Sequence, residues 1–308
     1  VAGDLAKMDF AVTIFEAQSE PGGVLLFGIP EFRLQKDVVR REITELLHLG
    51  VEIRTNQLAG VDFTVDDLFA QGYDAIFMGT GTSLPRTLDI PGKELTGILT
   101  ATYFLRTVVL ADSGKLDESE TVLHTGDNVI VVGAGNVAMD AARTALRLGA
   151  EVHIVYRRSE AELPARAEEV HHAKEEGIIF DLLTNPTEIL VDENDAVAGM
   201  KCIRMELGEP DESGRRRPVE VVGSDFTIDA DPVIMALGPS PNPLISNTTK
   251  GLEINRWRCI VADESNGKTT KEGVYAGGDA VTGAATVILA MEAGRAGARG
   301  IDEYLSAK

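Results

Sequence analysis

Short apolar, β-branched runs alternate with helical stretches along most of the chain. The run Asn128–Val132 (NVIVV) is continuously apolar after its first residue, as in a buried parallel strand. The stretch Met139–Leu148 then repeats small and apolar residues at helical spacing, and Glu151–Arg158 (EVHIVYRR) is again strand-like. This alternation predicts an α/β fold with parallel sheets.

A second unit of the same kind is indicated at the start of the chain. The run Ala11–Ala17 (AVTIFEA) follows a helical stretch, as Glu151–Arg158 does. Both runs have the position of the second strand in a dinucleotide-binding βαβ unit. The pattern therefore predicts two Rossmann-like domains. The first strand and glycine loop are seen only in the later unit, so we expect the chain to open inside the helix of the earlier one.

Composition narrows the classes of function. The chain has 308 residues, enough for two domains, and 29 Lys plus Arg against 49 Asp plus Glu leave a net charge of −20. Such a charge disfavours binding to nucleic acid or to anionic membranes. Two cysteines, Cys202 and Cys259, are too few for a disulfide framework or the four thiolates of an iron–sulfur cluster. Two lone thiols fit a reducing compartment, so a cytoplasmic protein is expected. With no run of 18 apolar residues, the sequence predicts no membrane span.

The strongest motif lies between the strand and the helix of the later unit. Gly133-Ala134-Gly135-Asn136-Val137-Ala138 reads G-x-G-x-x-A at the place where a dinucleotide site needs it. Gly133 makes the tight turn, Gly135 admits a pyrophosphate to the backbone, and small Ala138 lets helix and strand pack closely. Amides at the start of the helix, at Asn136 and Val137, then face the phosphates.

The end of the next strand discriminates between cofactors. An NAD site usually carries Asp or Glu there, whereas this chain has Arg157 and Arg158, with Arg166 on the following segment. Guanidinium groups favour a 2′-phosphate, so the prediction is NADP(H) rather than NAD(H). The alternative is that Arg157 and Arg158 lie on an ordinary solvated surface.

The earlier unit has the signs of an adenine-nucleotide site of flavin type. Its strand ends in Glu16, which suits a ribose hydroxyl, and the turn Pro21-Gly22-Gly23 follows. Near the other end of the chain, Gly273–Asp279 (GVYAGGD) reads as a strand with a carboxylate beside two glycines, before a helix that begins within Ala284–Gly294. Two further loops, Gly79–Thr82 and Ala236–Pro239, follow apolar strands and are predicted crossover points between the domains.

Taken together, these motifs resemble the two-dinucleotide-domain flavoproteins related to the pyridine nucleotide-disulfide oxidoreductases. The resemblance is nearest to the small (beta) subunit of NADPH-dependent glutamate synthase and its electron-bifurcating and dihydropyrimidine dehydrogenase relatives. Besides the motifs above, it is carried by Gly28–Lys36 (GIPEFRLQK), Gly133–Asp140 (GAGNVAMD), Val155–Arg158 (VYRR), Pro164–Glu169 (PARAEE) and Thr282–Leu289 (TGAATVIL).

The resemblance implies an NADP domain inserted into a discontinuous FAD-type domain. The FAD-type domain would comprise residues 1–98 and 239–308, and the NADP domain residues 99–238. The implied FAD-binding residues are Glu16 at the adenosine ribose, Gly23 and Arg33 near the pyrophosphate and flavin, Thr80, Gly81 and Gly278 in the glycine turns, Asp279 at the ribityl chain or pyrophosphate, and Ala285, Thr286 and Val287 near the pyrimidine edge of the flavin. The implied NADPH-binding residues are Gly133, Gly135, Asn136, Val137, Ala138, Arg157, Arg158 and Arg166.

The implied activity is hydride transfer from NADPH to FAD, with electrons delivered to a large subunit or an iron–sulfur partner protein. Such a transfer depends on alignment and electrostatics, so no catalytic acid, base, nucleophile or metal ligand is predicted. A thioredoxin-reductase-like disulfide enzyme is excluded because the sequence has no C-x-x-C. The neighbouring residues His171 and His172 are expected on a solvated helix, and Gly214–Arg217 at a charged hairpin tip.

Two features of the family are absent from this sequence: its N-terminal cysteine-rich domain, and the first strand and glycine loop of its FAD unit. Since that strand is central in a doubly wound sheet, we expect FAD to bind weakly or not at all. The alternative function is therefore an NADP-binding module without bound flavin or turnover.

Overall fold

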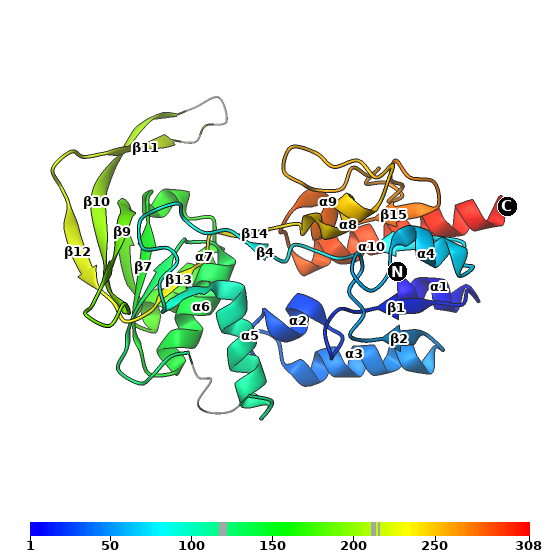
Figure 1. Cartoon of the computed structure of the whole chain (residues 1–308), viewed down its shortest axis with the longest axis horizontal. Helices are drawn as coiled ribbons and strands as arrows, with labels where there is room; N and C mark the ends of the chain where they lie inside the picture. The colour runs from blue at the N-terminus through cyan, green and yellow to red at the C-terminus, as the bar shows by residue number, and fades with distance from the viewer. Residues whose placement is uncertain (117–121, 211–213, 215) are drawn as a thin grey trace. The chain divides into compact units, whose positions relative to one another are not determined.

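A computed structural model of the chain describes residues 1–116, 122–210, 214 and 216–308 (Figure 1). These residues form two compact units. The first unit comprises Val1–Leu26, Leu34–Leu84 and Pro239–Lys308, and the second comprises Phe27–Arg33 and Pro85–Gly238. The predicted α/β class, with one unit inserted into a discontinuous other, is confirmed.

The chain passes from one unit to the other after Leu84 and after Gly238, close to the predicted crossover loops. The segment after Leu84 belongs with the second unit because Leu88, Ile90 and Leu95 pack against its core, and the Ile189 amide donates to the carbonyl oxygen of Pro91 at 3.0 Å. The boundary predicted at residue 98 therefore differs from this structural one. As functional domains, 1–98, 99–238 and 239–308 stay a proposal.

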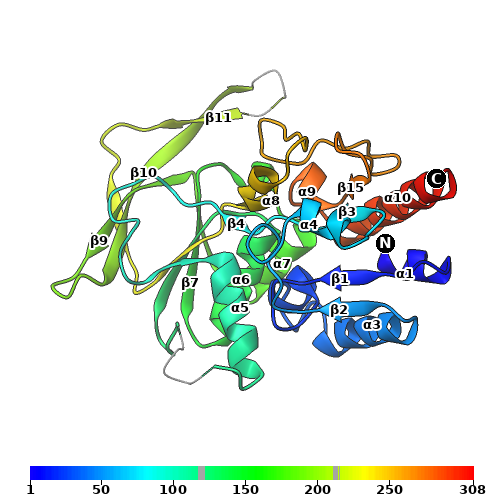
Figure 2. The same ribbon diagram turned by 45° about the vertical axis from the view of Figure 1, so that its right-hand side comes forward.

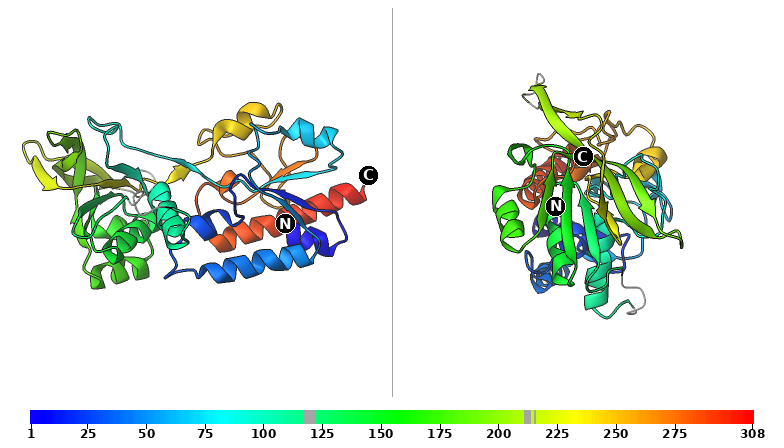
Figure 3. Two further views of the ribbon diagram at one scale, coloured as in Figure 1. Left: turned by 60° about the horizontal axis from the view of Figure 1, so that its bottom comes forward. Right: turned by 90° about the vertical axis from the view of Figure 1, so that its left-hand side faces the viewer.

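The second unit is built on five parallel strands in the order β5-β13-β6-β7-β8. Helices cover one face of this sheet and an antiparallel sheet covers the other (Figure 3). The parallel strands are β5 (Ile98–Thr100), β6 (Asn128–Val132), β7 (Glu151–Tyr156), β8 (Ile179–Leu182) and β13 (Val233–Met235). The helices are α5 (Ala101–Asp112), α6 (Asn136–Arg147), the short 3₁₀ turn η2 (Glu160–Glu162) and α7 (Ala167–Glu175). The antiparallel strands are β9 (Thr184–Val191), β10 (Val197–Pro210), β11 (Arg216–Glu220) and β12 (Phe226–Asp229).

The apolar run of β6 follows from this double cover. Val129 and Val131 face the helices, while Ile130 and Val132 face the antiparallel sheet, and all four are at most 3% exposed. A strand covered on both faces needs apolar residues at every position rather than at alternate ones. The predicted strand–helix–strand unit is confirmed as β6, α6 and β7.

The charged hairpin is longer than predicted. Strands β10 and β11 pair antiparallel as far as Pro210 opposite Arg216, so Arg216 and Arg217 lie in a strand rather than at the tip. Ladder pairing continues to the end of β10. Arg215 of the predicted segment lies outside the described residues.

The first unit holds two pairs of parallel strands, β1 with β2 and β3 with β15. In Figures 1 and 2, β1 and β2 lie side by side with α3 next to them. The strands are β1 (Thr13–Phe15), β2 (Glu52–Arg54), β3 (Ile76–Met78) and β15 (Val274–Ala276). The helices are α1 (Ala2–Lys7), α2 (Gly23–Phe27), α3 (Lys36–His48), α4 (Val65–Ala70), α8 (Pro243–Thr248), α9 (Asp279–Thr282) and α10 (Val287–Ser306). The short strands β4 (Leu84–Pro85) and β14 (Pro239–Ser240) pair where the chain passes between the units.

Helix α10 approaches its neighbours closely through glycines. A Cβ at Gly297 would lie 2.3 Å from Cε2 of Phe77 in β3, and one at Gly300 would lie 2.2 Å from the backbone oxygen of Asn266. A Cβ at Gly294 would make only ordinary contact, 3.5 Å from a methyl group of Val1. The C-terminal half of α10 can therefore pack this closely because Gly297 and Gly300 have no side chains.

We predict opposite effects of two glycine-to-alanine changes in α10. Gly300→Ala drives a methyl group into the backbone at Asn266 and should lower the free energy of unfolding by about 1–3 kcal/mol. Gly294→Ala has room and a helical backbone, so it should raise this free energy by about 0.5–1 kcal/mol. Urea unfolding of both variants measures the difference. Equal effects would show that α10 is not seated by this close approach.

Candidate functional site

The glycine loop after β6 is closed on one side and open on the other. Gly133 has φ 122°, and a Cβ there would lie 2.4 Å from the carbonyl oxygen of Ala236, so only glycine fits. A Cβ at Gly135 would meet no atom within 4 Å. Gly135 is also the N-cap of α6, where no side chain caps the helix, while Ala138 is fully buried against the sheet. Open space beside uncapped helix amides is what a pyrophosphate group needs.

Three backbone links gather other segments around this loop. The Gly133 amide donates to the carbonyl oxygen of Val155 at the end of β7, at 3.0 Å. The Ala165 amide donates to the carbonyl oxygen of Ala134 at 3.2 Å, and the Arg166 amide donates to Oδ1 of Asn136 at 3.0 Å. The segments that carry Arg157, Arg158 and Arg166 are thereby tied to the glycine loop.

The three arginines differ in their surroundings. Arg157 and Arg166 are exposed, and neither has a carboxylate partner among the described residues. Arg158 is half-buried and its Nε donates to the carbonyl oxygen of Arg216 at 3.2 Å. The segments bonded to the glycine loop therefore carry three arginines, in a protein of net charge −20.

A buried ion-pair network lies against the same helix. Asp140 of α6 is 4% exposed, and both of its oxygens accept hydrogen bonds from Nη1 of Arg33, at 2.7 and 2.9 Å. Nη2 of Arg33 also lies 3.2 Å from a carboxylate oxygen of Glu169 in the first turn of α7. Burial raises the pKa of Asp140 in spite of the pull from Arg33.

The network continues along α6. Arg143 binds Glu169 through Nη1 at 2.8 Å and Glu176 through Nη2 at 2.8 Å, and Arg147 also binds Glu176 at 2.7 Å. The ring of Phe32 packs under the guanidinium groups of Arg147 and Arg143, whose central carbons lie 4.0 and 4.7 Å from the ring centroid. Hydrogen bonds from Arg147 and Arg143 lower the pKa of Glu176 to about 2.

This network is what the sequence interpretation missed. The segment Gly28–Lys36 drew attention as a motif, and Arg33 was expected near the FAD pyrophosphate. The structure places Arg33 in the second unit, where Asp140 and Glu169 engage its guanidinium group. No local pattern indicates this contact, because Asp140 is 107 residues away from Arg33 in the sequence.

In the first unit, the expected FAD-binding residues follow the carboxyl ends of parallel strands, where ligands of α/β sheets bind. Glu16 follows β1, and its side chain accepts from the Gln18 amide at 2.8 Å. Gly23 begins α2 with φ 51°, and a Cβ there would meet no atom within 4 Å. Thr80 and Gly81 follow β3, and Gly81 also has open space around it.

The residues after β15 form one small group. Gly278, with φ 67°, is the N-cap of α9, and Asp279 is the first residue of that helix. Oδ1 of Asp279 accepts from the Ala285 amide at 3.2 Å, which ties it to the start of α10 at Thr286 and Val287. Burial raises the pKa of the Asp279 carboxyl group. The start of α10 has no side-chain cap, and Val287 is 42% exposed.

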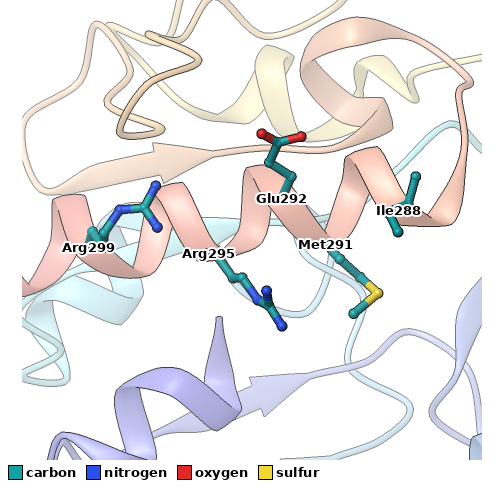
Figure 4. A pocket seen from close by; sticks show the side chains of 5 residues that line it. All are labelled: Ile288, Met291, Glu292, Arg295 and Arg299. Atoms are coloured by element: carbon teal, nitrogen blue, oxygen red, sulfur yellow. The ribbon is translucent and has the colours of Figure 1, made fainter.

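A cavity of about 490 Å³ runs along α10. It is lined by Ile288, Met291, Glu292, Arg295 and Arg299 (Figure 4). Figure 4 shows Met291 and Arg295 pointing from α10 towards the blue ribbon of the N-terminal residues. Ile288 and Met291 are 73% and 54% exposed, so the first turns of α10 present apolar surface that no described residue covers.

The described residues contain no group of three His, Cys, Asp or Glu side chains placed to hold a metal ion. His171 and His172 lie on α7 as expected, with exposed side chains. Among the described helices, none is long and apolar enough to cross a bilayer.

Comparisons with known proteins agree with this geometry. Residues 4–294 match the family described as pyridine nucleotide-disulphide oxidoreductase. The chain is 44% identical to the NADP(+)-dependent formate dehydrogenase subunit beta of Moorella thermoacetica, over 99% of this chain and 42% of that protein. It is 37% identical to the putative glutamate synthase [NADPH] small chain of Cereibacter sphaeroides, over 99% of this chain and 74% of that protein.

The fold also matches solved structures. FprA of Mycobacterium tuberculosis in complex with NADPH has a TM-score of 0.80 with 20% identity, over 99% of this chain and 82% of that one. The chain spans about half the length of several of the curated relatives that it matches. The resemblance to glutamate synthase small subunits is confirmed.

The depressed pKa of Glu176 predicts a pH dependence of stability. Since this pKa is about 2 in the fold and 4.5 normally, the ion pairs stabilise the fold above pH 4.5 and lose their effect as the pH falls towards 2. Glu176→Gln should therefore destabilise the protein at pH 7, and its difference from the parent should shrink below pH 4.5. Urea unfolding at a series of pH values measures it, with exposed Glu175→Gln as the control. A difference that stays constant from neutral to acidic pH would contradict the assignment.

Proposed function

Because the chain belongs to the pyridine nucleotide-disulphide oxidoreductase family, we propose that it oxidises NADPH and passes the hydride to FAD. The observation that carries this proposal is the set of arginines tied to an open glycine loop, where an NAD site would hold a carboxylate. The names of the relatives, which include NADP(+)- and NADPH-dependent oxidoreductase subunits, support it.

In this proposal the second unit binds NADPH. Gly133 and Gly135 admit the pyrophosphate, and the amides of Asn136 and Val137 together with the helix dipole stabilise its charge. Ala138 keeps α6 close to the sheet. Arg157, Arg158 and Arg166 bind the 2′-phosphate, because guanidinium groups form short charge-assisted hydrogen bonds to phosphate oxygens.

The first unit binds FAD in this proposal. Glu16 accepts from the adenosine ribose, Gly23, Thr80, Gly81 and Gly278 allow close backbone approach, and Asp279 binds the ribityl chain or pyrophosphate. Ala285, Thr286 and Val287 lie near the pyrimidine edge, where the positive end of α10 stabilises negative charge. Bound FAD supplies the two-electron acceptor that can release electrons one at a time.

Electron delivery to a partner completes the proposal. The relatives at 44% and 37% identity are named as a subunit and a small chain, so each works within a larger assembly. We propose a large subunit or an iron–sulfur protein as the acceptor. The sequence holds two cysteines, fewer than the four thiolates of a cluster, which places any cluster outside these residues.

One observation favours a second candidate function, that of an NADP-binding module without turnover. In the described part of the first unit, β1–β2 and β3–β15 form two separate pairs rather than one continuous sheet. A flavin site on a divided sheet lacks part of its backbone support, whereas the sheet of the second unit is continuous.

The first test concerns the cofactor. Replacing both Arg157 and Arg158 with Ala should weaken NADPH binding by about 10–100-fold and leave NADH binding nearly unchanged, since only NADPH carries the 2′-phosphate. Isothermal titration with each nucleotide measures this, with the surface arginine variant Arg40→Gln as control. Equal losses for both nucleotides would exclude a role in 2′-phosphate recognition.

The second test separates the two candidate functions. If the protein transfers hydride, its visible spectrum after addition of FAD should show a flavin band near about 450 nm that bleaches when NADPH is added under anaerobic conditions. NADPH binding without a retained flavin band would support the binding module instead. NADH serves as the matched control, since it should bleach the band far more slowly.

A further inference from the structure

The segment Phe27–Arg33, here called the strap, leaves the first unit and returns to it within seven residues. On the first-unit side, Nζ of Lys36 donates to the carbonyl oxygen of Leu25 at 3.0 Å, and Lys36 is only 6% exposed. This hydrogen bond holds together the chain on the two sides of the strap.

The last two residues of the strap, Phe32 and Arg33, are held by strong contacts. Arg33 binds buried Asp140 through two hydrogen bonds and Glu169 through an ion pair, and Phe32 packs under Arg143 and Arg147. Hydrogen bonds between two charged groups are among the strongest in proteins. Loss of Arg33 would leave Asp140 buried without its main partner, which is costly.

Arg33 also separates two like charges. Asp140 and Glu169 are close enough for Glu169 to raise the pKa of Asp140. With Arg33 between them, both carboxylates are neutralised and α7 is drawn to α6. Without it, their repulsion acts on the first turn of α7, where Arg143 still binds Glu169.

Arg166, which binds the 2′-phosphate in the proposed function, directly precedes the first turn of α7. Glu169 lies three residues after Arg166, the N-cap of α7. Arg166 and Ala165 are bonded through their amides to Asn136 and Ala134 of the glycine loop. Glu169 is thus one helical turn away from Arg166, so a displacement of Glu169 would change the position of Arg166.

We propose that Arg33 is a positioning residue for NADPH selectivity: through Asp140 and Glu169 it holds the start of α7 so that Arg166 faces the 2′-phosphate. This inference rests on the proposed function, in which Arg166 binds that phosphate. Arg33 itself does not touch the nucleotide.

A double-mutant cycle tests the proposal on the full chain. The variants are Arg33→Gln, Arg166→Gln and the double variant, and the readout is the dissociation constant for NADPH and for NADH by fluorescence titration. Arg33→Gln should weaken NADPH binding by roughly tenfold while NADH changes less than about twofold. The double variant should bind NADPH no more weakly than Arg166→Gln alone, because Arg33 acts through Arg166.

Two further variants serve as controls. Arg147→Gln removes an arginine of the same network that binds Glu176 at the far end of α7, so the ratio of the two dissociation constants should not change. Arg33→Lys keeps the charge but replaces Nη1 and Nη2, which bind Asp140 and Glu169, with a single ammonium group. It should therefore restore part of the preference for NADPH. If Arg33→Gln does not fold, Glu169→Gln breaks the same link and should shift the ratio in the same direction.

The outcomes separate the two ideas. An unchanged NADPH-to-NADH ratio in Arg33→Gln, with a reduced ratio in Arg166→Gln, would overturn the positioning role alone. An unchanged ratio in Arg166→Gln would overturn its role at the 2′-phosphate and the inference with it. Equal weakening of both nucleotides in Arg33→Gln would show a general structural role and would also overturn the proposal.

Discussion

The close contact between Gly133 and the carbonyl oxygen of Ala236 is the constraint on which the nucleotide site depends. Because β13 pairs with β6 in parallel register, Met235 opposite Val132, the next carbonyl group of one strand meets the first loop residue of the other. The backbone at Gly133 must then turn with a positive φ, and α6 starts two residues later without a side-chain cap. The segments from β7 and α7 bond to this same loop. The approach of Gly133 to Ala236 thus sets the path of the loop to which the segments from β7 and α7 are bonded.

In this acidic protein, the arginines on α6 and the strap are paired with carboxylates, whereas the arginines after β7 are outside these pairs. Three guanidinium groups, of Arg33, Arg143 and Arg147, are matched by the carboxylates of Asp140, Glu169 and Glu176. The charges of α6, α7 and the strap therefore neutralise one another. The arginines that follow β7 are left outside this network, where a phosphate can neutralise them. The same network anchors Phe32 and Arg33, so the strap and the charge balance are one feature.

The first unit brings its candidate residues together by a different means. Its strands are short, and the residues that follow β1, β3 and β15 gather at their carboxyl ends because parallel strands all point the same way. Helix α10 lies close to β3 at Gly297 and close to the backbone of Asn266 at Gly300, and the Ala285 amide just before its uncapped start donates to Asp279. The apolar residues of its first turns, Ile288 and Met291 among them, remain exposed along the cavity.

The sequence by itself determined the local parts of this protein. The β6–loop–α6–β7 unit, the glycines that its turn requires, the arginines after β7 and the helix that begins near Thr286 are all encoded by neighbouring residues, whose spacing and chemistry decide their conformation. Only the tertiary structure decided the partner of Arg33, the assignment of Phe27–Arg33 and of 85–98 to the second unit, and the strand order β5-β13-β6. The physical reason is that an ion pair or a strand pairing between residues far apart in the chain depends on what is buried against what. That burial is a property of the packed molecule, and a linear pattern of residues does not contain it.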